Sequence, residues 1–132
     1  MPLRFVAFAA GAGLSDSHHA ANVTGVYSPG FGDPMQERRV ALIKRVAPKA
    51  KSIGVLFSPG EALSVSLKDK LTVAAEKAGM KVVAMPLNNA GEGTEATNAL
   101  LAKNVGAIEI FGNAAHAAFE SIIAAAKEKG VP

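Results

Sequence analysis

Short apolar runs alternate with amphipathic segments along this chain, and this alternation limits the folds that it can adopt. Continuous apolar stretches predict strands at Leu3–Phe8, Ser52–Phe57, Lys81–Leu87 and Ala107–Phe111, with a weaker candidate at Val23–Tyr27. Helical apolar spacing predicts helices over Pro34–Ala47, Ala62–Ala78, Glu92–Lys103 and Ala114–Lys129. Strands that are apolar throughout are typical of parallel sheets covered on both faces. We therefore expect an α/β domain with a mainly parallel sheet.

Residues at the ends of these segments support the predicted boundaries. Asp33 can cap the first helix, Pro34 suits its first turn, and Gln36 completes a spacing similar to a capping box. Gly79 is placed to end the second helix, because glycine readily adopts the left-handed conformation found there. On the last helix we expect an apolar stripe to face the sheet, formed by Ala115, Phe119, Ile122, Ile123 and Ala126.

The composition fits one compact domain and excludes several kinds of site. A chain of 132 residues falls within the size of a single domain, and 49% of its residues are hydrophobic. The absence of cysteine excludes disulfides and thiolate metal sites. The net charge of +3 is modest, and the basic residues are spread along helices without interleaved aromatic residues, so we expect no nucleic-acid partner. No stretch is long enough to span a membrane.

The start of the chain allows two interpretations. Arg4 and the apolar stretch after it superficially match a signal peptide, but the charge is minimal and Gly11 and Gly13 interrupt the apolar region. A buried strand followed by a glycine loop fits better, so the sequence predicts no clear signal peptide. The glycine pair also lacks the third glycine of a dinucleotide fingerprint, because that position is Asp16. We expect no nucleotide cofactor.

No combination of residues indicates catalysis or metal binding. His18 and His19 would point to opposite faces of a strand, which makes them a poor chelating pair and favours a surface loop. His116 is expected to be a solvated helix residue. Glu109 lies in an apolar strand and would need a partner there, which the sequence does not identify. We therefore expect no enzyme activity, no cofactor and no metal.

Seven residues, all polar except Phe111, lie at or just after the ends of three predicted strands. They are Ser58, Glu61 and Ser64 after one strand, Asn88 and Asn89 after the next, and Phe111 and Asn113 at the end of the last. Parallel strands end at one edge of a sheet, so these residues predict a single edge that binds a small polar ligand. A structural role is the alternative: Ser58 and Asn113 are good helix N-caps, and Glu61 suits the start of a helix.

The chain resembles the substrate-binding proteins of ABC transporters, in the type I periplasmic-binding-protein class. The similarity lies in Asn22-Val23-Thr24-Gly25-Val26, in residues 45–50, and in residues 53–64, which hold a strand, a polar loop and a helix start. The resemblance implies a three-layer, Rossmann-like lobe with a mainly parallel sheet. It also implies that residues 1–33 hold the terminal strand of the other lobe plus a hinge or crossover, with Asn22, Thr24 and Gly25 at the hinge. Residues 34–132 would form a truncated second lobe.

The resemblance also implies a function. The protein would bind an amino acid or sugar-like solute reversibly in a cleft between two lobes, in the periplasm, and deliver it to an ABC permease. At two positions where relatives often have polar residues, this chain has Leu63 and Gly112. Either the ligand is less polar or the site has decayed. The alternatives are an effector-sensing domain of a transcription regulator with the same fold, or a small α/β enzyme.

The implied absence of part of the protein has a consequence for assembly. A chain that lacks most of one lobe would expose apolar residues such as Phe5, Val6 and Phe8, together with an open sheet edge. We expect a homodimer, in which the first strand is exchanged between subunits. A monomer would require that strand to pack on its own chain.

Overall fold

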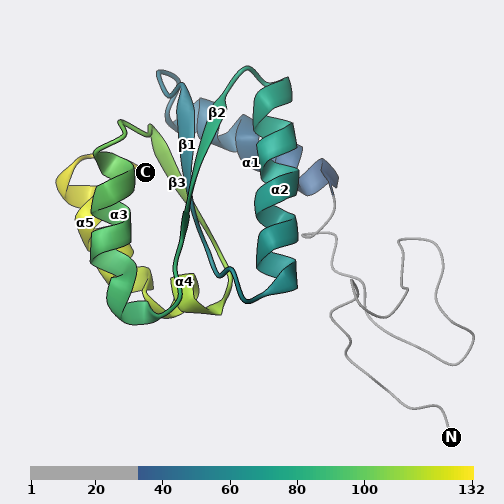
Figure 1. Ribbon diagram of the computed structural model, residues 1–132. Helices are drawn as coiled ribbons and strands as arrows, with labels where there is room; N and C mark the ends of the chain where they lie inside the picture. Colours follow the sequence, from purple (N-terminus) through teal and green to yellow (C-terminus); the bar gives the residue numbers. More distant parts are fainter. Residues whose placement is uncertain (1–32) are drawn as a thin grey trace, which may run out of the picture.

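A computed structural model describes residues 33–132 of the chain (Figure 1). The strands predicted at 3–8 and 23–27, the hinge residues Asn22, Thr24 and Gly25, and the proposed boundary at residue 33 cannot be compared with it, because residues 1–32 lie outside the described part.

The described residues form a parallel sheet of three strands. These are β1 (Ser52–Phe57), β2 (Lys81–Pro86) and β3 (Ala107–Phe111), in the order β2-β1-β3. Val55 of the central strand pairs with Ala84 on one side and Glu109 on the other. The middle of β1 is buried on both faces, which explains its continuous apolar sequence, whereas β2 and β3 are partly exposed.

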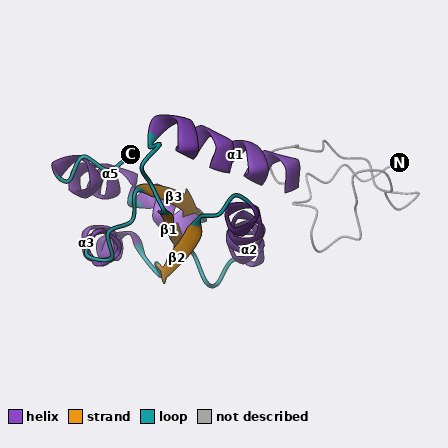
Figure 2. Cartoon of the chain, turned by 90° about the horizontal axis from the view of Figure 1, so that it is seen from above, coloured by secondary structure: helices purple, strands orange, loops and turns teal. Residues whose placement is uncertain are grey.

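Helices cover both faces of the sheet (Figures 1 and 2). The helices α1 (Asp33–Val46) and α2 (Ala62–Lys77) lie on one face, and α3 (Gly93–Leu101) and α5 (Phe119–Glu128) lie on the other. A short 3-10 turn, η3 (Ala90–Glu92), precedes α3, and a short helix, α4 (Asn113–Ala117), follows β3. The predicted three-layer α/β lobe with a parallel sheet is confirmed.

The core is divided by the sheet into two apolar clusters. The cluster beneath α1 and α2 contains Ile53, Val55 and Phe111 from the sheet, and Val40, Ile43, Leu67 and Leu71 from the helices. The cluster beneath α3 and α5 contains Leu56 from β1 with Leu100, Val105, Ala115, Ala118 and Ile122. Alternate residues of β1 thus face opposite layers, as the pleat of a strand requires.

The prediction of one continuous last helix is wrong, because the structure has two helices there. The segment is divided at Ala118, whose backbone (φ −91°, ψ 7°) leaves the helical conformation. Ala118 is buried against Gly93 of α3, where an added Cβ atom would come within 2.7 Å of the alanine Cβ. The break changes which side chains face the sheet. Ala115, Ile122 and Ala126 are buried as predicted, whereas Phe119 (47% exposed) and Ile123 (43%) are not.

The start of α1 also differs from the prediction. Gln36 does not complete a capping box, because its side chain is fully buried and neither amide atom has a hydrogen-bond partner in the described part of the chain. Gln36 faces inward with Val40, one helical turn further on. The end of α2 agrees with the prediction: Gly79 follows the helix with a φ of +74°. Within residues 33–132, no helix combines the length and the apolarity needed to cross a bilayer.

Candidate ligand-binding edge

The loops after β1 and β3 are joined where the strands end. The backbone N–H of Ser58 donates to the carbonyl oxygen of Phe111 (3.1 Å) and to Oγ of Ser64 (2.9 Å). The Ser64 hydroxyl in turn donates to the carbonyl oxygen of Phe111 (2.9 Å). Ser58 and Ser64 are both buried. The two hydroxyl residues predicted at this edge therefore hold it together from within.

The same two loops close the first turn of α4. Oε1 of Glu61 accepts a hydrogen bond from the backbone N–H of Asn113 (2.8 Å), and Oγ of Ser58 accepts one from Ala114 (3.2 Å). The positions predicted for the caps are wrong, because Glu61 occupies the N-cap position of α2 and Gly112 that of α4. Of the two predicted caps, only Ser58 caps a helix with its side chain, and it does so at α4, from the neighbouring loop. Glu61 caps α4 from the same loop, whereas Asn113 contributes only the backbone N–H that donates to it. The sequence could not predict these contacts, because the bonded residues lie 52 and 56 positions apart in the chain.

Gly112 has a structural reason to be glycine. Its φ of +94° lies in a region that side chains disfavour, and an added Cβ atom would come within 2.4 Å of Oγ and 2.6 Å of Cβ of Ser58. A side chain at position 112 would therefore collide with the loop after β1. At Leu63 no comparable constraint exists; its side chain is half-buried beside the apolar cluster under α2.

Asn88 and Asn89 belong to a separate, local arrangement. Oε2 of Glu92 accepts from the backbone N–H of Asn88 (2.9 Å), and Oε1 accepts from the side-chain amide of Asn89 (2.6 Å). Oδ1 of Asn89 accepts from the backbone N–H of Gly91 (3.0 Å). Both asparagines are exposed, and their hydrogen bonds shape the turn between β2 and η3.

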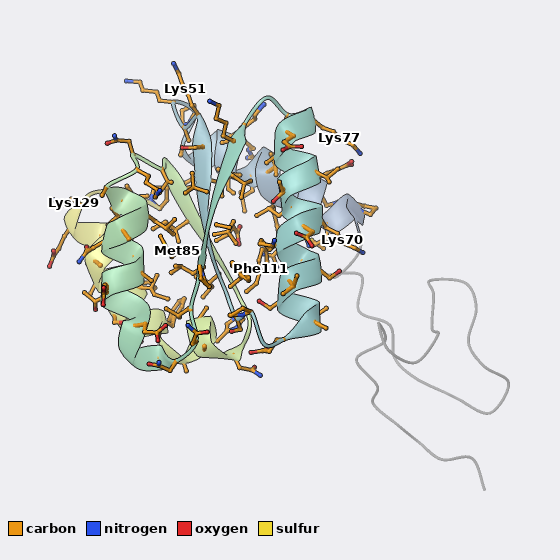
Figure 3. The ribbon with its side chains drawn as sticks, viewed as in Figure 1. Lys51, Lys70, Lys77, Met85, Phe111 and Lys129 are labelled. Carbon is orange, nitrogen blue, oxygen red and sulfur yellow. The ribbon has the colours of Figure 1, made fainter. Side chains whose placement is uncertain are left out.

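An open hollow of about 380 Å³ lies between the start of α2 and the end of β3. We call it the edge hollow. Of the predicted ligand-binding residues it includes Glu61, Ser64, Phe111 and Asn113, whereas Ser58, Asn88 and Asn89 do not line it. The other lining residues are Arg39, Leu63, Leu67, Glu109, Ile110, Gly112, His116 and Phe119. Figure 3 labels Phe111, which lies between the sheet and α2.

The charged wall of the edge hollow consists of an ion pair. Nη1 of Arg39 on α1 donates to Oε2 of Glu109 on β3 (3.0 Å), and its guanidinium lies over the ring of Phe111, 5.6 Å from the centroid. Burial raises the pKa of the Glu109 carboxyl above its ordinary value, and the charge of Arg39 and its hydrogen bond only partly oppose that rise. Arg39 is the partner that Glu109 was predicted to need, and it could not be identified from the sequence because it lies 70 residues earlier in the chain.

His116 has an exposed ring at the rim of the edge hollow. Its Nδ1 atom lies 2.7 Å from the carbonyl oxygen of Gly112. Within residues 33–132, no group of three histidine, aspartate or glutamate side chains is placed to hold a metal ion. Arg39 and Phe119 were missed as lining residues. For Arg39 the only available signal was its position, one residue before the inward-facing Val40. Phe119 was predicted to face the sheet because the helix break at Ala118 was not foreseen.

Comparisons with solved structures give a consistent set of neighbours. A conserved domain protein from Vibrio cholerae is 37% identical (TM-score 0.69), over 84% of this chain and 36% of that one. An ABC domain in complex with L-Trp from Streptococcus pneumoniae is 28% identical (TM-score 0.71), over 84% and 37%. A ligand-free, open substrate-binding protein with adhesive properties from Clostridium difficile is 26% identical (TM-score 0.69), over 84% and 36%.

The chain spans little more than a third of the length of these neighbours. No curated protein matches it significantly. A family model described as ABC transporter substrate binding protein matches residues 1–132. The match includes both the segment before α1 and all the elements from α1 to α5, so the chain belongs to the ABC transporter substrate binding protein family.

Proposed function

We propose that this chain supplies one wall of the ligand cleft in a solute-binding component of an ABC importer. Members of its family are extracytoplasmic proteins that bind small molecules and work with ABC permeases. The ligand of this protein would be an amino acid or a sugar-like solute, bound reversibly between two lobes. The S. pneumoniae neighbour, which is in complex with L-Trp, favours the amino acid.

The edge hollow is the observation that carries this proposal. It places the Arg39–Glu109 pair and the Glu61 carboxylate beside apolar side chains such as Leu63 and Phe119, which suits a small ligand with both polar and apolar parts. It lies at the carboxyl ends of parallel strands, where open α/β sheets bind ligands. Binding without turnover is favoured because the Ser64 hydroxyl, which lines the hollow, is engaged with a backbone carbonyl.

The second wall of the cleft would come from another lobe. On this proposal residues 1–33 carry the crossover between lobes, with Asn22, Thr24 and Gly25 at the hinge, and closure presents the loaded protein to the permease. A lobe that offers only one wall makes about half the contacts while most of the entropic cost of association remains. We therefore expect weak or absent ligand binding by the 132-residue chain itself.

Calorimetry on two proteins tests the proposal. The first is this chain, and the second is a chimera in which it replaces the matching segment of the V. cholerae neighbour, which supplies the remaining residues. A panel of amino acids and small sugars should give no measurable heat with the chain, whereas one ligand class should bind the chimera. Turnover of a panel compound, tight one-to-one binding by the chain itself, or a folded chimera that binds nothing would contradict the proposal.

Matched substitutions in the chimera locate the ligand. Glu61→Gln changes a carboxylate that lines the edge hollow, and Glu92→Gln changes one that organises the turn after β2. We expect the first to weaken binding about tenfold or more, because a charge-assisted contact is lost, and the second to leave it within about twofold. Equal effects would place the ligand elsewhere.

A further inference from the structure

Exposed lysines gather at the amino edge of the sheet, opposite the edge hollow. We call this surface the basic pole and define it by Lys49, Lys51, Lys77, Lys81, Lys103 and Lys129, all of which are exposed. Figure 3 labels Lys51, Lys77 and Lys129, which come from segments far apart in the sequence. The sequence shows these lysines only as scattered along the chain, and the fold brings them together.

The topology explains why they meet. Each strand begins shortly after a helix ends, so the ends of α1, α2 and α3 lie at the edge where β1, β2 and β3 begin. Residues 130–132, which follow α5, line the same hollow as Lys49 and Lys51. Cations near helix ends interact favourably with the helix dipole, and Lys44 illustrates this by donating to the carbonyl oxygen of Ala78. Lys49, Lys51 and Lys81 lie beyond the helices, in a loop and at a strand start, where the dipole does not account for them.

Acidic residues are distributed in the opposite way. Glu61, Glu92 and Glu120 lie at the carboxyl edge, beside the starts of α2, α3 and α5. At the basic pole the six lysines outnumber the nearby carboxylates, which are Glu76, Glu128 and Glu37, whose Oε1 lies 3.5 Å from Nζ of Lys77. The described part of the molecule is therefore electrically polarised along the strand direction, and its basic end attracts anionic surfaces over about one Debye length.

The apolar residues distinguish between kinds of anionic surface. Phe57, Phe111 and Phe119 all lie toward the carboxyl edge, so in the described part no aromatic ring is available at the basic pole to stack on a nucleic-acid base. Val46, in contrast, is 60% exposed at the end of α1. It lines a shallow hollow of about 620 Å³ together with Pro48, Lys49 and Lys51. An apolar side chain framed by lysines suits the boundary between lipid headgroups and acyl chains.

We propose that the basic pole docks on a bilayer that contains anionic phospholipid, with Val46 and Pro48 at the headgroup boundary. The contact is electrostatic and reversible, since a juxtamembrane lysine contributes about 1 kcal/mol and salt screens it. It leaves the edge hollow, at the other end of the strands, open to ligand. This inference stands apart from the proposed ligand site, because it uses none of the same residues.

Vesicle sedimentation with the 132-residue chain tests the charge dependence. Vesicles of phosphatidylcholine with added phosphatidylglycerol should bind the chain at low salt and release it at high salt, whereas pure phosphatidylcholine should not bind it. Lys49→Gln with Lys51→Gln should lower partitioning by about fivefold for each lysine removed. Arg38→Gln with Lys70→Gln removes the same charge away from the pole and should lower it less than twofold.

Apolar substitutions separate a bilayer from other polyanions. Val46→Ser should weaken binding to anionic vesicles severalfold, whereas Val73→Ser, at a residue 52% exposed on α2, should not. Neither substitution should change binding of the protein to a DNA duplex, which is a polyanion without an apolar layer. The proposal is overturned if pure phosphatidylcholine binds equally well, or if the Lys49/Lys51 and Arg38/Lys70 double variants lose equal amounts of vesicle binding. It is also overturned if Val46→Ser leaves vesicle binding unchanged while DNA binds as tightly as the vesicles.

Discussion

Gly112 lies where the loop after β3 comes close to Ser58 in the loop after β1. Gly112→Ala should destabilise the protein by about 2–4 kcal/mol, because it combines an unfavourable φ of +94° with a Cβ contact of 2.4 Å to Ser58. Urea unfolding followed by circular dichroism measures the change. Gly60→Ala is the matched control, since a Cβ there would meet nothing within 4 Å, and it should shift stability by less than about 1 kcal/mol. Equal losses of stability in the two variants would contradict the close contact between Gly112 and Ser58.

Glu109 should make stability fall with rising pH. Its carboxyl has a pKa above the ordinary value of 4.5, so the folded state holds the proton more tightly than the unfolded state. The unfolding free energy should therefore decline as pH rises from about 4.5 through the raised pKa. Glu109→Gln should remove that part of the decline in urea titrations across this window.

Glu128→Gln is the control for this pH dependence, because Glu128 is an exposed carboxylate at the end of α5. It removes a carboxylate of the same type while leaving the Arg39–Glu109 pair intact. An increase in wild-type stability over the same window that Glu109→Gln abolishes would mean that Arg39 outweighs burial and lowers the pKa of Glu109 instead.

The roles of individual residues could be predicted from the sequence only in part. Sequence reasoning identified the polar residues at the strand ends, and it recognised that a carboxylate in the strand Ala107–Phe111 needs a partner. The sequence could not identify Arg39 as that partner, because no local pattern links positions 70 residues apart. It also assigned Ser58 to the helix that follows it, whereas the hydroxyl caps α4 from across the edge. Local capping rules describe the chemistry of such a group but not its long-range partner.

At the scale of elements, the contact between α3 and α5 depends on Gly93. An added Cβ atom there would lie 2.5 Å from Oγ of Ser121 and 2.7 Å from Cβ of Ala118. Gly93→Ala should therefore destabilise the protein by about 1–3 kcal/mol, despite the higher helix propensity of alanine. Thermal unfolding checks this against Thr94→Ala, an exposed neighbour that should be nearly neutral. A neutral Gly93→Ala would show that the two helices separate easily.

Element types were largely predictable, and most boundaries agreed within one or two residues. Apolar runs identified β1 and β3 in full, and Gly79 marked the end of α2. The break at Ala118 was not predictable, because no proline or glycine interrupts the segment from Asn113 to Glu128. The break lies where Ala118 packs closely against Gly93, and α4 is capped by another loop; both are tertiary contacts that local sequence does not reveal.

At the scale of the whole molecule, we expect concentration-dependent self-association. Within the described sheet β3 is an edge strand, although the backbone N–H of Ile108 donates to the carbonyl oxygen of Pro132 (2.8 Å). Phe119 and Ile123 expose apolar surface on α5, and Phe119 lines the same hollow as Ile110 of β3. Unpaired edges and apolar surface both promote association.

Light scattering over a range of concentrations measures this association. Ile123→Glu should shift the protein toward the monomer, whereas Val73→Glu, on α2 away from β3, should not. A monomer at every concentration would refute the homodimer. Equal shifts for both variants would place the interface on another surface.

The hydrogen bonds that join the edge loops also bear on kinetics. Ser58, Ser64 and Glu61 already hold the loop after β1 against the start of α4. If a solute binds here as proposed, this wall has little left to order. A preorganised surface avoids the entropic cost of ordering. Encounter rates should then be similar for related solutes, and selectivity should appear in how long each one stays bound.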